Sequence, residues 1–121
     1  MNYVIADSKS ERRSAFQSAL KDYPELYFQG SFPTEAALLA EVFGSAPDIA
    51  FIYVGDKEFN AFSVAEHIRA RAPDTKIIFL SEKRDYALPA FEIGVDNYLL
   101  LPPDEVRIHN MLHDYEKRRS G

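Results

Sequence analysis

Short apolar runs alternate along the chain with stretches whose apolar residues recur every three or four positions. The apolar runs predict strands at residues 3–6, 26–32, 47–54, 76–80 and 97–101. The periodic stretches predict helices at residues 9–22, 34–43, about 62–72, 82–93 and 104–117. Strand and helix therefore alternate five times, which favours an α/β domain with a doubly wound, five-stranded parallel sheet.

Local signals refine the ends and faces of two helices. Ser8 is followed three residues later by Glu11, the pattern of a capping box at a helix start. In that helix we expect Arg12 and Arg13 to stay in water. Gly94 is expected to end the helix at 82–93 in the left-handed region. The residues expected to face the core from that second helix are Ala87, Ala90 and Phe91.

Composition narrows the class of protein. The chain has 121 residues, 46% of them hydrophobic, which suits one domain at 1–117 with a tail or linker start at 118–121. It contains no cysteine, so disulfides and thiolate chemistry are excluded. A net charge of −5 disfavours direct nucleic-acid binding, and the basic run at 117–119 is read as a solvated helix end. With no membrane-spanning stretch, a cytoplasmic protein is expected.

The predicted strand at 47–54 is the centre of the sheet, and its end directs attention to candidate chemistry. In open parallel sheets, ligands bind at the carboxyl ends of the strands. The positions at those ends are Asp7, Ser8, Tyr53, Ser81 and Leu101. They contain only one carboxylate among them, which is an unusual set for a catalytic site.

The second half of the chain carries a family resemblance, in the segments 77–81, 85–88, 90–94 and 97–100. With these segments, the chain resembles response-regulator receiver domains over essentially its whole length, most of all those attached to LytTR-type DNA-binding domains. The resemblance implies a flavodoxin-like receiver fold with strand order 2-1-3-4-5.

The resemblance also implies which side chains a working phosphorylation site would need. Such a site uses two acids after strand one to hold magnesium, an acid nucleophile on strand three, a hydroxyl after strand four and a lysine after strand five. Asp7 keeps the first acid and Ser81 keeps the hydroxyl, whereas Ser8, Tyr53 and Leu101 replace the other three groups. Because an anionic nucleophile needs cations to approach a phosphoryl group, we expect no catalytic residue and no enzyme here.

Tyr53 is expected to plug this degenerate phosphorylation pocket. Its ring would fill the volume of the metal and phosphoryl group, pack against Leu101, and give its hydroxyl to Asp7 or Ser81. Ser81 is otherwise expected to cap the helix behind it. Tyr98, at the position of the family's switch aromatic, is expected to stay in one rotamer.

Two metal alternatives remain open. Asp7 could bind a cation together with Asp56 or Glu58, although this is a thin ligand set for magnesium, so no cofactor is expected. His109 and His113 lie one helical turn apart, a spacing that can share a metal, but without a third ligand a solvated helix face is the simpler interpretation.

The sequence thus predicts a pseudo-receiver that signals by binding, N-terminal to a DNA-binding output domain of a transcription regulator. An unusual but still phosphorylatable receiver and a free-standing adaptor are the alternatives. We expect a protein partner or self-association through residues 82–93, 97–101 and 104–117, DNA contact only through the output domain, and no membrane contact. The candidate interface residues are Arg84, Tyr86, Glu92, Asp96, His109 and His113.

Overall fold

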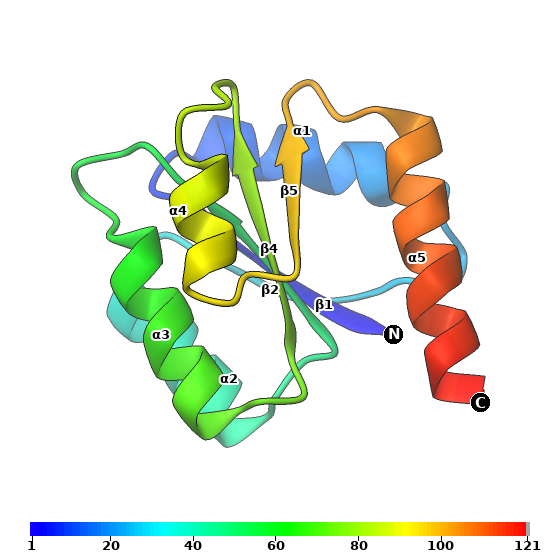
Figure 1. Cartoon of the computed structure of the whole chain (residues 1–121), viewed down its shortest axis with the longest axis horizontal. Helices are drawn as coiled ribbons and strands as arrows, with labels where there is room; N and C mark the ends of the chain where they lie inside the picture. The colour runs from blue at the N-terminus through cyan, green and yellow to red at the C-terminus, as the bar shows by residue number, and fades with distance from the viewer. Residues whose placement is uncertain (121) are drawn as a thin grey trace.

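The computed structural model describes residues 1–120, with side chains described through Arg118, and has five strands and five helices in strict alternation (Figure 1). The strands are β1 (Asn2–Ala6), β2 (Tyr27–Phe32), β3 (Ile49–Tyr53), β4 (Lys76–Ser81) and β5 (Asn97–Leu100). The helices are α1 (Ser10–Leu20), α2 (Glu35–Gly44), α3 (Ala61–Arg71), α4 (Ala87–Glu92) and α5 (Glu105–Ser120). Gly121, the last residue of the expected 118–121 tail, lies outside the described residues, so the domain boundary after residue 117 stays a prediction.

All strand pairs are parallel, and the order is β2-β1-β3-β4-β5, which confirms the predicted doubly wound sheet. Helices α1 and α5 cover one face, and α2, α3 and α4 lie on the other, with β5 at the sheet edge between α4 and α5 (Figure 1). Every residue of β3 is buried, because this strand pairs on both edges and is covered on both faces.

The alternation of side chains along β3 divides the interior into two apolar clusters. Ala50 and Ile52 pack in the cluster beneath α2 and α3, whereas Phe51 and Tyr53 pack in the cluster beneath α1 and α5. Tyr53 therefore belongs to the α1 side of the sheet. This placement decides which helix can reach its ring.

The expected capping box at Ser8 is wrong. Helix α1 begins at Ser10, its N-cap residue is Lys9, and no side chain caps it. The Ser8 hydroxyl instead donates to Asp56 Oδ2 across 2.5 Å. The local pattern predicted that the Ser8 side chain caps the helix, but it bonds to a residue 48 positions away in the sequence.

The predicted helix at 82–93 is shorter than expected, because α4 spans only Ala87–Glu92. Pro89 has no N–H group and is tolerated in a first turn, where N–H groups lack helical partners, but not in a helix interior. Starting at Ala87 puts Pro89 in that first turn. Phe91 was expected to face the core and is 51% exposed, whereas Gly94 has φ +92° as predicted. None of the helices within residues 1–120 is long and apolar enough to cross a membrane.

Candidate functional site

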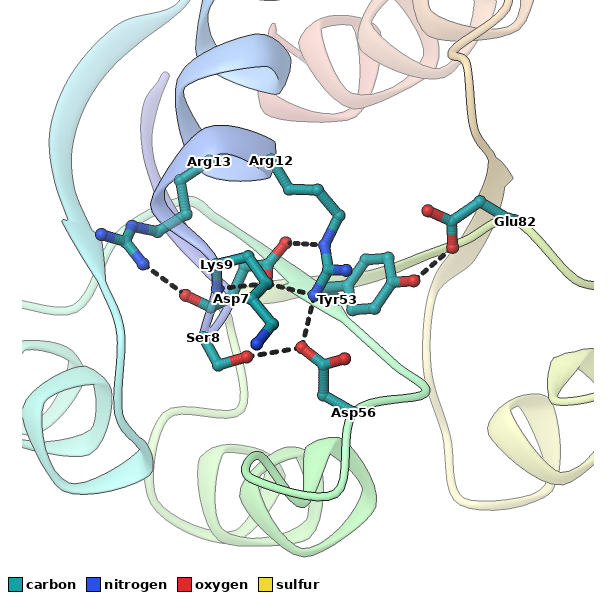
Figure 2. Close-up of polar contacts among 8 residues, drawn as sticks. All are labelled: Asp7, Ser8, Lys9, Arg12, Arg13, Tyr53, Asp56 and Glu82. Atoms are coloured by element: carbon teal, nitrogen blue, oxygen red, sulfur yellow. Dashed lines mark hydrogen bonds and ion pairs between the residues drawn. The ribbon is translucent and has the colours of Figure 1, made fainter.

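The carboxyl ends of β1, β3 and β4 bring three side chains to one edge of the sheet. Asp7 follows β1, Tyr53 ends β3, and Glu82 follows β4. The strands are parallel and in register, with Ala6 opposite Ile52 and Tyr53 opposite Leu80. The loop after β3 adds Asp56, and the first turns of α1 add two arginines (Figure 2).

Asp7 is only 3% exposed, and its carboxylate is fully engaged. Arg12 binds it through two parallel hydrogen bonds, Nε to Oδ2 at 2.8 Å and Nη2 to Oδ1 at 2.7 Å (Figure 2). The backbone N–H of Lys9 also donates to Oδ1, at 2.9 Å. Arg13 donates to the backbone carbonyl of Asp7 at 2.6 Å. A forked pair of charged hydrogen bonds is the strongest arrangement that a carboxylate and a guanidinium can make.

Arg12 joins two loops through the same guanidinium group. Besides Asp7, its Nη2 donates to Oδ2 of Asp56, which also accepts the Ser8 hydroxyl (Figure 2). The hydrogen bond to Asp7 raises the pKa of Arg12 further above its already high value. The expectation that Arg12 stays in water is therefore wrong.

Tyr53 lies beneath that guanidinium, with the Arg12 Cζ atom 3.6 Å from the ring centroid. The Tyr53 hydroxyl donates to Glu82 Oε2 (Figure 2). The expected partners, Asp7 and Ser81, are thus replaced by a residue that the sequence did not single out. Burial, followed by the hydrogen bond to Glu82, raises the pKa of Tyr53, so the phenol is neutral at physiological pH.

Ser81 and Tyr98 hold the loop that connects β4 to α4. The buried Ser81 hydroxyl accepts from the backbone N–H of Lys83 at 3.0 Å, and the Tyr98 hydroxyl donates to the Lys83 carbonyl. Ser81 does not cap α4, which begins six residues later at Ala87. Tyr98 is 9% exposed, so its ring points inward.

Leu101 comes directly after β5 and is half-buried. It packs against the apolar cluster that contains Tyr53, and its N–H donates to the Ser81 carbonyl at 2.9 Å. The peptide bond to Pro102 is cis. An apolar residue thus stands where the resemblance places a lysine.

The donor set at this site does not fit a divalent cation. Both Asp7 oxygens accept from Arg12, and Oδ2 of Asp56 accepts from Arg12 and Ser8. Magnesium requires nearly octahedral oxygen ligands, and here a guanidinium lies among the acids instead. Within the described part of the chain, no group of three or more His, Asp or Glu side chains could hold a metal ion.

Four of the six candidate interface residues are exposed. Arg84 lies in the loop before α4 rather than on that helix, and Glu92 is on α4. His109 and His113 lie on α5 with their rings stacked at a centroid distance of 6.4 Å. Whether they meet a partner stays a prediction.

The other two candidates make contacts within the domain. Tyr86 is half-buried, with its ring centroid 6.5 Å from that of Phe62. Asp96 Oδ2 accepts from Arg69 Nη2 at 2.6 Å and from the backbone N–H of Ile77 at 2.8 Å. Both side chains therefore have a structural role besides any role in binding.

Sequence reasoning missed Arg12 and Glu82. A usable signal existed for Arg12, which precedes the buried Phe16 by four residues and so shares its helix face. No pattern pointed to Glu82. Its contact with Tyr53 depends on how the loop after β4 approaches the end of β3.

Comparisons with known proteins agree with this architecture. No family model matches the chain. The sensory transduction protein LytT of Bacillus cereus is 28% identical over all 121 residues, and LytT of Bacillus subtilis is 35% identical over 71 residues, 59% of this chain and 30% of that protein. The B. cereus match covers 49% of the relative, so the chain spans about half the length of the curated relatives it matches.

Solved structures show the same fold. The response regulatory domain of mrkE from Klebsiella pneumoniae superposes with a TM-score of 0.84 at 22% identity, covering 98% of this chain and 97% of that one. The isolated REC domain of RcsB from Salmonella enterica gives 0.81 at 18% identity, covering 97% and 88%. The chain thus has the fold of response-regulator receiver domains. The curated proteins to which it is similar in sequence include sensory transduction proteins of the LytT and LytR type.

Proposed function

We propose that this domain is a pseudo-receiver that transmits signals by protein binding, without being phosphorylated. The observation that carries the proposal is the state of Tyr53 at the acceptor position. The residue is 7% exposed, its ring lies under Arg12, and its hydroxyl donates to Glu82. A neutral, buried phenol is a poor phosphoryl acceptor, because Leu101 stands at the position of the lysine and the guanidinium of Arg12 is already paired with Asp7 and Asp56.

The hydrogen bonds of the loop between β4 and α4 support the proposal that the domain stays in one conformation. Three hydroxyl groups hold it, those of Tyr53, Ser81 and Tyr98, and all three bond to Glu82 or Lys83. Each bond contributes on the order of 1 kcal/mol, and together they favour one loop conformation. On this proposal the Tyr98 ring stays inward whether or not phosphoryl donors are present.

The face formed by α4, β5 and α5 is the proposed binding surface. Leu88 on α4 is 70% exposed, and Val106 on α5 is 66% exposed. Between β5 and α5 runs a groove of about 410 Å³ whose lining includes Asp96, Arg107 and Asp114. Charges of both signs on one surface suit a twofold dimer, in which each patch meets its own copy.

The proposed setting is a transcription regulator in which a DNA-binding domain follows this one. The chain covers about half of LytT, and RcsB, a protein of the same fold, has been observed bound to promoter rprA. On this proposal DNA is contacted by the output domain alone. A free-standing adaptor would have no such domain, so the length of the natural open reading frame distinguishes the two.

Incubation with acetyl phosphate or beryllofluoride in the presence of magnesium tests the central claim. We expect no change in intact mass and no spectral change for this chain, whereas a working receiver domain measured in parallel gives an adduct. The matched variant restores the missing groups through Ser8→Asp, Tyr53→Asp and Leu101→Lys. A stoichiometric adduct on the unaltered chain contradicts the proposal.

A further inference from the structure

We propose that Arg12 is a permanent, intramolecular cation that stands in for a divalent metal ion at this site. Its guanidinium lies between the carboxylates of Asp7 and Asp56, so a positive charge is present whether or not metal is available. The inference rests on the proposed function, because it explains how the same pocket stays folded without metal or phosphoryl group. Its test measures cation dependence and not phosphorylation.

The Nε and Nη2 atoms of the guanidinium group reach both carboxylates. The Nε and Nη2 atoms bind the two oxygens of Asp7, and Nη2 also reaches Asp56 (Figure 2). Arg12 therefore connects the loop after β1 with the loop after β3. A bound metal ion with one ligand from each loop would make the same connection.

The face of the guanidinium is used as well. The Tyr53 ring lies 3.6 Å below the Arg12 Cζ atom. Arginine is weakly hydrated and stacks on aromatic rings, whereas magnesium gives up water reluctantly and seeks oxygen on all sides. The replacement of an acid by Tyr53 therefore makes the pocket a better site for arginine and a poorer one for metal.

Arg13 shows that the arrangement is particular to Arg12. Its Nη1 atom donates to the backbone carbonyl of Asp7, at 2.6 Å, and among the described residues it forms no salt bridge with a carboxylate. The two neighbouring arginines thus carry the same charge at the same helix start with different partners. Arg13→Ala is consequently a matched control for Arg12→Ala.

Thermal unfolding with and without added cations tests the inference. For the unaltered chain, we expect millimolar MgCl₂ or MnCl₂ to shift the unfolding midpoint no more than NaCl of equal ionic strength. Arg12→Ala leaves the buried Asp7 carboxylate unpaired, so its midpoint should fall by roughly 10 °C. Divalent ions should then restore part of the loss, and NaCl should not. Arg13→Ala should show a smaller loss and no specific rescue.

Several results would overturn the inference. They are a saturable stabilisation of the unaltered chain by divalent ions, an Arg12→Ala variant as stable as Arg13→Ala, or equal effects of MgCl₂ and NaCl on Arg12→Ala. If Arg12→Ala does not fold, Arg12→Lys is measured in the same way. Because lysine keeps the charge without the planar fork, this variant should fold, with an unfolding midpoint below that of the unaltered chain. A phosphoryl adduct on the unaltered chain, together with the expected responses of the unfolding midpoints to cations, would contradict the proposed function but not this inference.

Discussion

The guanidinium carbon of Arg12 lies 3.6 Å from the centre of the Tyr53 ring, at the place where β3 ends. This stacking joins two side chains that look unrelated in the sequence. Tyr53 stands where the resemblance places an acid, and Arg12 lies over its ring while binding Asp7. The pocket is thereby closed by its own side chains.

Loss of the Tyr53 hydroxyl should loosen the loop after β4. Tyr53→Phe keeps the ring beneath Arg12 but removes the hydrogen bond to Glu82, so we expect a loss of about 1 kcal/mol in the free energy of unfolding. Hydrogen exchange should become faster at the Lys83 amide. The Ser45 amide, which bonds to Glu41 at the end of α2, is the internal control. Unchanged exchange at Lys83 would show that Tyr53 does not hold the loop.

The buried carboxylate of Asp7 should matter more than that of Asp56. Asp7→Asn keeps the shape of the side chain but removes the charge that pairs with Arg12, and we expect a loss of about 2–3 kcal/mol. Asp56 is more exposed and lies on a loop, so Asp56→Asn should cost about 1 kcal/mol. Urea unfolding measures both. The reverse order would mean that Asp7 is not the main partner of Arg12.

Alkaline pH should destabilise the fold partly through Tyr53. The folded-state pKa of this phenol is raised, mainly by burial, so the unfolded chain releases its proton at a lower pH than the folded chain does. The contribution of this group is therefore fully present below about pH 10 and is lost as the pH rises toward the folded value.

Urea midpoints measured from neutral to alkaline pH check this expectation. Tyr3, Tyr23 and Tyr115 also have raised pKa values, so a decline remains in any single variant. In Tyr53→Phe the decline above about pH 10 should be shallower than in the unaltered chain. Parallel curves would count against the assignment to Tyr53.

Self-association should depend on α4. Phe91 is 51% exposed on this helix, and Phe91→Glu places a charge on the proposed binding surface. We expect dimerisation to weaken by about tenfold or more, because exposed aromatic side chains often carry a large share of interface energy. Light scattering across concentration measures the change. Tyr27→Glu, at a 64% exposed position on the edge strand β2, is the matched control and should behave like the unaltered chain.

The sequence by itself determined the fold, and it predicts which parts of the family's phosphorylation chemistry are missing. Strands such as β3 are apolar throughout because both faces are covered, so a run of consecutive apolar residues is enough to predict them. The identities at positions 8, 53 and 101 are likewise visible without coordinates. They support the inference that the usual chemistry is absent.

Only the tertiary structure decided the partners of the polar side chains. Ser8 could have capped α1 or bonded across the site, and it bonds to Asp56. The Tyr53 hydroxyl was expected to bond to Asp7 or Ser81, and it donates to Glu82. Such choices depend on loops that approach from distant parts of the chain, and differences of a few ångströms settle them. Hydrophobic periodicity fixes which face a residue occupies, but not which neighbour completes its hydrogen bonds.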